Sequence, residues 1–198
     1  MGIHEVKSEL PRAIFLDRDG VINVSVVRDG KPYAPSTVEE FTLLPGVVEA
    51  CRKLKDAGFI LVVATNQPDV GRGTQPQATV EAMHAKMCAV LPIDRVEVCY
   101  HAGRGEPECD CRKPKPGMLL RAAADLGIDL KNSFMVGDRW RDIDCGQAAG
   151  VRTIFIDYNY DEALRQAPDH RVKDLAEAAD LILSLSVERR IDAGPRPR

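Results

Sequence analysis

Two kinds of hydrophobic pattern alternate along this chain. Short runs of consecutive apolar residues bounded by polar residues are typical of buried strands, whereas apolar residues that recur every three or four positions are typical of amphipathic helices. The pattern predicts strands over residues 13–16, 59–64, 96–100, 133–136 and 152–156, and helices over residues 45–57, 75–90, 116–126, 142–149 and 173–185. Because strands and helices alternate, we expect an α/β fold in which helices cover both faces of a parallel sheet.

Residues 24–34, directly after the first predicted strand, have a different pattern. Two short β-prone stretches there surround the pair Asp29-Gly30. An Asp-Gly pair between such stretches is typical of a two-residue hairpin turn. We therefore expect a short β-hairpin flap after the first strand, and no large cap.

The composition of the 198 residues, 44% hydrophobic and 29% charged, is typical of a soluble globular protein. We expect one domain over residues 13–186, an N-terminal segment of residues 1–12 and a flexible tail of residues 187–198. The net charge of −3 disfavours a nucleic-acid partner, since such partners usually require clustered Lys and Arg. The sequence has neither a membrane-length apolar run nor the apolar core of a signal peptide, so we expect a cytoplasmic monomer that binds no membrane.

Polar side chains follow several of the predicted strands. Asp17 and Asp19 come after the first strand, Thr65 and Asn66 after the second, Lys113 in the loop after the third, and Asp138 and Asp142 after the fourth. Ligands of such sheets bind beyond the carboxyl ends of the strands, so these groups are expected to meet at one edge. A single aspartate at a strand end is more often a turn former or a helix cap, but the combination favours a catalytic site.

The chemistry of this set fits phosphoryl transfer. Asp17 and Asp138 can share Mg²⁺, which prefers oxygen ligands and neutralises the repulsion between a phosphate and an attacking carboxylate. Asp17 can attack phosphorus to form an acyl phosphate, and Asp19 can protonate the leaving alcohol and later deprotonate a water molecule. Thr65 can donate a hydrogen bond to the phosphate, and Lys113 adds positive charge where negative charge builds up.

Four motifs resemble those of the haloacid dehalogenase-like phosphatases. They are Phe-Leu-Asp17-Arg-Asp19-Gly-Val-Ile-Asn, Ala-Thr65-Asn66-Gln67, Arg112-Lys113-Pro-Lys-Pro-Gly-Met and Val-Gly-Asp138-Arg-x-x-Asp142, within residues 13–156. The chain is most similar to the subgroup of histidinol-phosphate phosphatases and D-glycero-D-manno-heptose 1,7-bisphosphate phosphatases. The marks of that subgroup here are Gly71-Arg72-Gly73 after the second motif and Cys-Asp-Cys-Arg-Lys-Pro at the third. The resemblance implies a Rossmann-like domain.

The resemblance also implies a role for individual residues. Asp17 corresponds to the nucleophile, Asp19 to the general acid and base, and Lys113 to the lysine of the third motif. The implied magnesium ligands are Asp17, the backbone carbonyl of Asp19, and Asp138, with Asp142 in the outer shell. The implied contacts to the substrate or its phosphates are Asn66, Gln67, Arg72, Arg112 and Arg139, the last at a position where relatives often have Lys.

A loop over residues 99–111 carries four soft metal ligands, namely Cys99, His101, Cys109 and Cys111. Tetrahedral Zn²⁺ suits a Cys₃His set, and a closed coordination sphere is typical of a structural site. A disulfide is not expected in a reducing compartment. The resemblance implies zinc as well, because these four positions form a zinc site in the heptose bisphosphate phosphatases. We expect zinc to fix the loop that carries Arg112 and Lys113. The remaining cysteines, Cys51, Cys88 and Cys145, are expected to pack as small core residues.

Together these features predict a Mg²⁺-dependent phosphoric monoester hydrolase that acts on a small phosphorylated sugar. The resemblance favours removal of the 7-phosphate of D-glycero-D-manno-heptose 1,7-bisphosphate; histidinol phosphate is the alternative, and the motifs leave that choice open. A nucleic-acid 3′-phosphatase is less favoured because the chain lacks a basic stripe. A non-catalytic, zinc-stabilised binding protein is disfavoured by the intact set of Asp17, Asp19, Lys113 and Asp138.

Overall fold

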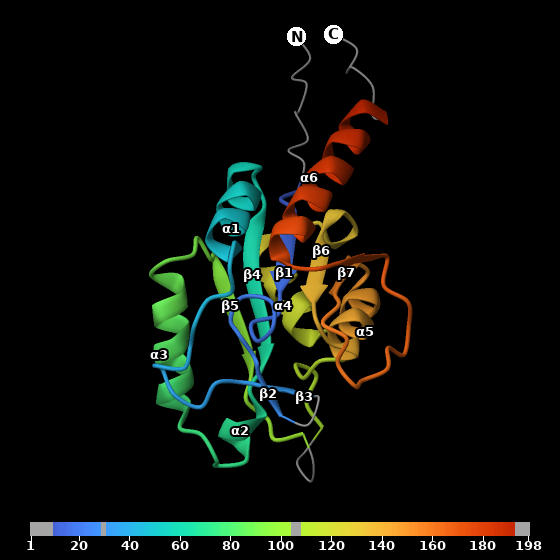
Figure 1. Ribbon diagram of the computed structural model, residues 1–198. Helices are drawn as coiled ribbons and strands as arrows, with labels where there is room; N and C mark the ends of the chain where they lie inside the picture. The colour runs from blue at the N-terminus through green and yellow to red at the C-terminus, as the bar shows by residue number, and fades with distance from the viewer. Residues whose placement is uncertain (1–9, 29–30, 104–107, 193–198) are drawn as a thin grey trace, which may run out of the picture.

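A parallel sheet of six strands lies at the centre of the computed structural model, which describes residues 10–28, 31–103 and 108–192 (Figure 1). In spatial order the strands are β5 (Arg95–Cys99), β4 (Ile60–Asn66), β1 (Ala13–Leu16), β6 (Phe134–Gly137), β7 (Arg152–Ile156) and β8 (His170–Val172). Every neighbouring pair is parallel. Because β1 lies between β4 and β6, the residues that follow it occupy the middle of the carboxyl edge of the sheet.

Helices cover both faces of the sheet, as the alternation of elements predicts. One face packs against α1 (Val47–Asp56), α3 (Gln77–Cys88) and α6 (Leu175–Asp192), and the other against α4 (Gly117–Leu126) and α5 (Trp140–Ala149). In β1, Ile14 and Leu16 belong to the first of these cores, and Ala13 and Phe15 to the second. Successive side chains of a strand point to opposite faces, so a strand between two cores has to be apolar throughout.

The predicted flap is an antiparallel hairpin of β2 (Val26–Arg28) and β3 (Lys31–Tyr33), in which Val26 pairs with Tyr33. The predicted turn at Asp29-Gly30 lies outside the described residues. The described ranges contain no second domain that could form a large cap.

Several element boundaries differ from the prediction. β4 continues to Asn66, so Thr65 and Asn66 are its last residues. α5 begins at Trp140 rather than at Asp142, because the Asp142 carboxylate accepts the Arg139 N–H at 3.0 Å, an interaction typical of helix starts.

The two ends of the chain and the shortest elements also differ from the prediction. α6 continues to Asp192 and includes the first part of the predicted tail, while residues 193–198 and 1–9 lie outside the described ranges. The strand β8, the short helix α2 (Pro68–Gly71) and a 3₁₀ turn at Leu130–Asn132 were not predicted. They are as short as β1 and β6 but lack the run of apolar residues that marks those two strands.

The expectation of buried cysteines is correct for Cys51 and Cys145 and wrong for Cys88, which is exposed. Cys88 is the last residue of α3, whose buried side is formed by Val80, Met83, His84 and Met87. None of the helices in the described part of the chain combines the length and the apolar character needed to span a membrane.

Candidate active site

Three of the predicted carboxylates meet at the carboxyl edge of the sheet. Asp17 follows β1, Asp138 follows β6, and Asp142 lies in the first turn of α5; each offers an oxygen within 4.8 Å of the others. Both Asp138 oxygens are buried, and the one described side chain that interacts with this carboxylate as a hydrogen-bond partner is the hydroxyl of Tyr160. Gly20, with φ of 88°, passes so close that any side chain there would collide with the Asp138 carboxylate. The result is a compact group of acidic side chains with room for a small cation.

Lys113 supplies the positive charge inside this group. Its Nζ lies 2.8 Å from Asp17 Oδ1 and 2.6 Å from Asp142 Oδ1, and its side chain is 3% exposed. Lys113 lies in the loop after β5, 96 positions after Asp17 in the sequence. The parallel sheet therefore brings the predicted lysine and the predicted nucleophile into direct contact.

Burial and neighbouring charges shift the pKa values of Asp17, Asp138 and Lys113. Burial raises the pKa of Asp17 to about 7, with a further increase from the charge of Asp142 and a decrease from Lys113. Burial, together with the charges of Asp17 and Asp142, raises the pKa of Asp138 well above its usual range. Burial alone would lower the pKa of Lys113, but the charges of Asp142 and Asp17 outweigh it and raise that pKa. One lysine does not neutralise three carboxylates, a condition that favours a bound divalent cation.

Asn66 fixes the backbone of Lys113 from both sides. Its Nδ2 donates to the Lys113 carbonyl at 3.0 Å, and its Oδ1 accepts the Lys113 N–H at 3.1 Å. Sequence reasoning places Asn66 in contact with the substrate; here its side-chain amide instead joins the end of β4 to the loop that carries the lysine, although the residue also lines the cavity.

Asp19 is held at the side of the site by three neighbouring side chains. The Arg18 guanidinium donates to both of its carboxylate oxygens, at 2.9 and 3.0 Å, Asn23 Nδ2 donates to Oδ1 at 3.0 Å, and Gln67 Nε2 donates to Oδ2 at 2.8 Å. Gln67 Nε2 also lies 2.9 Å from Thr65 Oγ1. Gln67 and Thr65 are buried, so the structure places them behind Asp19 rather than on the wall of the cavity.

Arg18 is the largest fully buried side chain described, and sequence reasoning assigned it no role. Its NH1 lies 3.1 Å from His84 Nε2 on α3. Burial, and secondarily the Arg18 charge, lowers the pKa of His84 to about 4, so His84 is neutral and can accept this hydrogen bond. Nothing in the spacing of polar residues indicates this contact, because the two residues are 66 positions apart.

The carboxylates and Lys113 face a cavity of about 290 Å³. Its walls come from the hairpin (Pro32, Tyr33 and Ala34), from the predicted residues Asp17, Asp19, Asn66, Arg72, Lys113, Asp138 and Asp142, and from Arg112, Arg139 and Arg141. The hairpin therefore lies over the carboxyl edge as expected for a flap. The cavity has acidic groups at its base and arginines around it, which suits an anionic ligand held with a cation.

Arg139 is engaged by a residue that sequence reasoning missed. Its guanidinium forms an ion pair with Glu162, donating from NH2 to Oε1 at 2.8 Å. Glu162 also accepts the Trp140 Nε1–H at 2.9 Å. Glu162 lies in the irregular segment between β7 and β8, where no periodic pattern exists that could indicate its position. Arg139 lines the cavity, but its charge is already paired.

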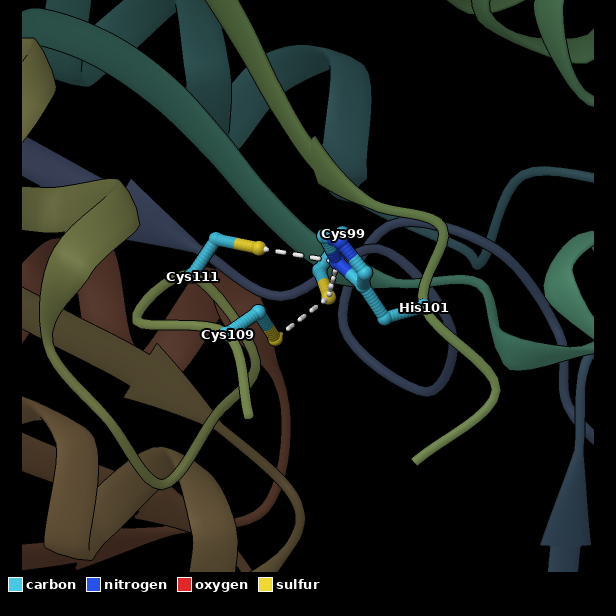
Figure 2. Close-up of side chains that lie close together, drawn as sticks. All are labelled: Cys99, His101, Cys109 and Cys111. Atoms are coloured by element: carbon cyan, nitrogen blue, oxygen red, sulfur yellow. Dashed lines mark hydrogen bonds between the residues drawn. The ribbon is translucent and has the colours of Figure 1, made fainter. Parts of the chain in front are cut away.

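The predicted zinc ligands converge at the end of β5 (Figure 2). His101 Nδ1 lies 3.5 Å from Cys99 Sγ and 3.3 Å from Cys111 Sγ, and the Cys99 and Cys109 sulfur atoms are 3.9 Å apart. All four ligand atoms lie within 4.8 Å of one another. Arg112 NH1 donates to the His101 carbonyl at 3.2 Å, so this cluster is linked directly to the residue beside Lys113.

The site combines a Rossmann-like sheet, an aspartate after its first strand, a lysine paired with that aspartate, and further carboxylates after β6. This combination defines a phosphoric monoester hydrolase of the haloacid dehalogenase-like class. The family model described as HAD-hydrolase-like matches residues 110–178. The chain is 40% identical over 148 residues to the D-glycero-β-D-manno-heptose-1,7-bisphosphate 7-phosphatase of Pseudomonas putida, covering 73% of this chain and 82% of that one.

Further relatives agree with this assignment. The chain is 42% identical to the enzyme of the same name from Escherichia coli, covering 71% of this chain and 76% of that one. The solved structure of D,D-heptose 1,7-bisphosphate phosphatase from B. bronchiseptica with magnesium and phosphate has a TM-score of 0.75 and 29% identity, covering 88% of this chain and 99% of that one. The chain belongs to the haloacid dehalogenase-like hydrolases, and within them to the family of these phosphatases.

Proposed function

We propose that this enzyme removes the 7-phosphate of D-glycero-D-manno-heptose 1,7-bisphosphate, with Mg²⁺ as cofactor and Asp17 as nucleophile. The observation that carries the proposal is the contact of Asp17 with Lys113 beside Asp138, at the base of a cavity surrounded by arginines. The curated relatives that match most of the chain are named for this reaction.

The donors at the site fit magnesium. Asp138 has two buried oxygens that no cation of the protein contacts within the described residues, and Asp17 offers a third oxygen nearby. We assign Asp17, Asp138 and the backbone carbonyl of Asp19 as the ligands, and Asp142 as the residue that holds Lys113 beside them. Bound there, Mg²⁺ would neutralise charge on both the phosphate and the attacking carboxylate.

The first chemical step is attack of an Asp17 oxygen on phosphorus. The bond from phosphorus to the sugar oxygen breaks, and that oxygen takes a proton from Asp19. Lys113 Nζ stabilises the negative charge on the transferring group, because it already lies 2.8 Å from the attacking carboxylate. The product of this step is the free sugar hydroxyl and an aspartyl phosphate.

The second step returns the enzyme to its starting state. Asp19, now a carboxylate, takes a proton from a water molecule that attacks phosphorus, and the bond between phosphorus and Asp17 breaks. The side chains of Arg18, Asn23 and Gln67 keep Asp19 in one orientation during both proton transfers. Thr65 supports this arrangement through Gln67.

Substrate contacts are assigned to the cations of the cavity wall. Arg72, Arg112 and Arg139 line the cavity with Asn66, and Gln67 acts behind them through Asp19. We further propose that the enzyme acts as a cytoplasmic monomer, a setting in which its cysteines remain reduced.

The Cys99, His101, Cys109 and Cys111 cluster fits Zn²⁺ because three sulfur atoms and one imidazole nitrogen converge from one short loop. Zinc there would hold the loop without taking part in the reaction. The hydrogen bond from Arg112 to the His101 carbonyl connects this loop to the cavity.

The test is phosphate release from a substrate panel by the purified enzyme with Mg²⁺. The panel contains both anomers of heptose 1,7-bisphosphate, heptose 7-phosphate, fructose 1,6-bisphosphate and histidinol phosphate. We expect the highest kcat/KM for a heptose 1,7-bisphosphate, and loss of turnover in Asp17→Asn. Preference for histidinol phosphate would replace the proposed substrate, and full activity of Asp17→Asn would refute the mechanism.

A further inference from the structure

A second cavity, of about 770 Å³, adjoins the catalytic one. Arg72, Arg112, Lys113 and Arg141 line both, so the two spaces lie side by side at these side chains. One wall of the second cavity is the loop that carries the Cys and His cluster, and the opposite wall contains Trp140, Arg141 and Arg165. A molecule bound at Asp17 therefore lies next to this space.

Three arginines of the second cavity have little or no counter-charge among the described residues. Within the described ranges, no carboxylate lies within ion-pair distance of Arg112 or Arg165, and Arg141 reaches Glu162 only at 3.9 Å. In contrast, Lys115 and Arg72, which also line this cavity, are paired with Glu108 at 2.7 Å and with Asp69 at 3.2 Å. The excess positive charge is thus confined to Arg112, Arg141 and Arg165.

Glu162 does not neutralise this wall because other donors already occupy its carboxylate. Both oxygens accept from the Arg139 guanidinium, and Oε1 also accepts from Trp140. Burial, together with the charges of Arg139 and other neighbours, lowers the pKa of Arg141, the direction expected where cations crowd without enough counter-charge.

Trp140 holds the two outer arginines in place. The Arg165 guanidinium carbon lies 3.4 Å from the centre of the indole ring, and that of Arg141 lies 4.7 Å from it. The ring itself is buried and fixed by the hydrogen bond from Nε1 to Glu162. Arginines stacked on an aromatic ring keep their N–H groups available at the ring edge, in the planar arrangement that suits a phosphate.

Resting on the phosphatase function proposed above, we infer that Arg141 and Arg165, stacked on Trp140, bind a second phosphate of the substrate, at the end of the sugar far from the phosphate that is cleaved. Arg141 occupies a position that the fourth motif leaves unspecified, and Arg165 lies outside all four motifs, in the irregular segment after β7. The ligand class is a sugar bisphosphate, and the two arginines set the preference for it over a monophosphate.

The experiment compares kcat/KM for a sugar bisphosphate and for the matching monophosphate, with heptose 1,7-bisphosphate and heptose 7-phosphate as one pair. We expect the wild-type enzyme to prefer the bisphosphate, and Arg141→Gln and Arg165→Gln each to reduce the ratio about tenfold, the effect of losing a charged hydrogen bond. The matched control is Arg171→Gln, which removes an exposed arginine paired with Asp157 outside both cavities. The inference would be overturned if the ratio of kcat/KM for the bisphosphate to that for the monophosphate were as low in Arg171→Gln as in the two variants. It would also be overturned if this ratio were unchanged in both Arg141→Gln and Arg165→Gln.

A second measurement separates this inference from the choice of sugar. Glucose 1,6-bisphosphate and glucose 6-phosphate are tested as competitive inhibitors of p-nitrophenyl phosphate hydrolysis, which needs no turnover of either sugar. Tighter inhibition by the bisphosphate, reduced in Arg141→Gln and Arg165→Gln, supports the subsite even if the heptose proves to be the wrong substrate. Equal inhibition by the two sugars in the wild-type enzyme contradicts it.

Discussion

Replacement of Lys113 by methionine would remove the one cation buried among the three carboxylates in the described part of the site. Methionine has a similar length, so the change deletes charge with little loss of volume. The Lys113 side chain is 3% exposed, and its Nζ lies 2.8 Å from Asp17 and 2.6 Å from Asp142. Removal of one partner from a buried ion pair costs about 3–5 kcal/mol, because the other charge is left uncompensated.

The loss of stability in Lys113→Met should depend on whether Mg²⁺ is bound. Without Mg²⁺, the carboxylates of Lys113→Met can relieve their repulsion only by taking up protons, and the pKa of Asp17, already about 7, rises further. With saturating Mg²⁺ the cation compensates part of the lost charge, so the destabilisation should shrink. Turnover should nevertheless fall about 100-fold or more, since the cation that stabilises the transferring phosphoryl group is gone.

The assay is urea unfolding followed by circular dichroism, with and without Mg²⁺, combined with kinetics on p-nitrophenyl phosphate. Lys115→Met is the matched control for stability, because Lys115 lies two residues away but is exposed and paired with exposed Glu108. An exposed pair is worth about 0–1 kcal/mol. The reasoning is refuted if the two variants have the same free energy of unfolding without metal.

Three further predictions concern residues around the site. The wild-type protein should lose up to about 3 kcal/mol of stability as the pH falls from about 6.5 to 4, because His84 takes up a proton in the unfolded chain but stays neutral in the folded one. His84→Gln should not show this loss, and urea unfolding across this pH range measures the difference. Asn66→Ala should cost about 1–3 kcal/mol and lower kcat, because both backbone groups of Lys113 lose a partner; unchanged kinetics would contradict this role. Protein purified without added zinc should contain about one zinc ion per chain, and Cys109→Ala should lose it; a metal-free wild-type protein would argue against the zinc site.

The residues at the ends of the strands could be predicted from the sequence because one rule governs them. Parallel strands end at a common edge, so Asp17, Thr65 and Asp138 had to lie close to one another once the strands were recognised. The cluster of Cys99, His101, Cys109 and Cys111 could be predicted equally well, because these four residues lie within thirteen positions of one another. In the first case the pattern of strands contains the geometric information, and in the second case the local spacing of the ligands does.

The contacts that support these residues could not be predicted in the same way. The hydrogen bonds between Asn66 and Lys113 join residues 47 positions apart, and the contact of Arg18 with His84 depends on how α3 packs on the sheet. Glu162 and Arg165 lie in a segment without periodicity, so only the folded chain reveals that they reach Trp140. Polar side chains of irregular segments carry no pattern that fixes their direction.

Trp140 is the only tryptophan of the chain, and this gives the enzyme a built-in optical reporter. Its indole is buried in the wall of the second cavity, with the Arg165 guanidinium over the ring and Glu162 at Nε1. All tryptophan emission therefore comes from one known position, and it responds to any ligand that shifts the charge stacked on the ring. Occupancy of the second cavity can be followed by intrinsic fluorescence at equilibrium, without a label and without turnover.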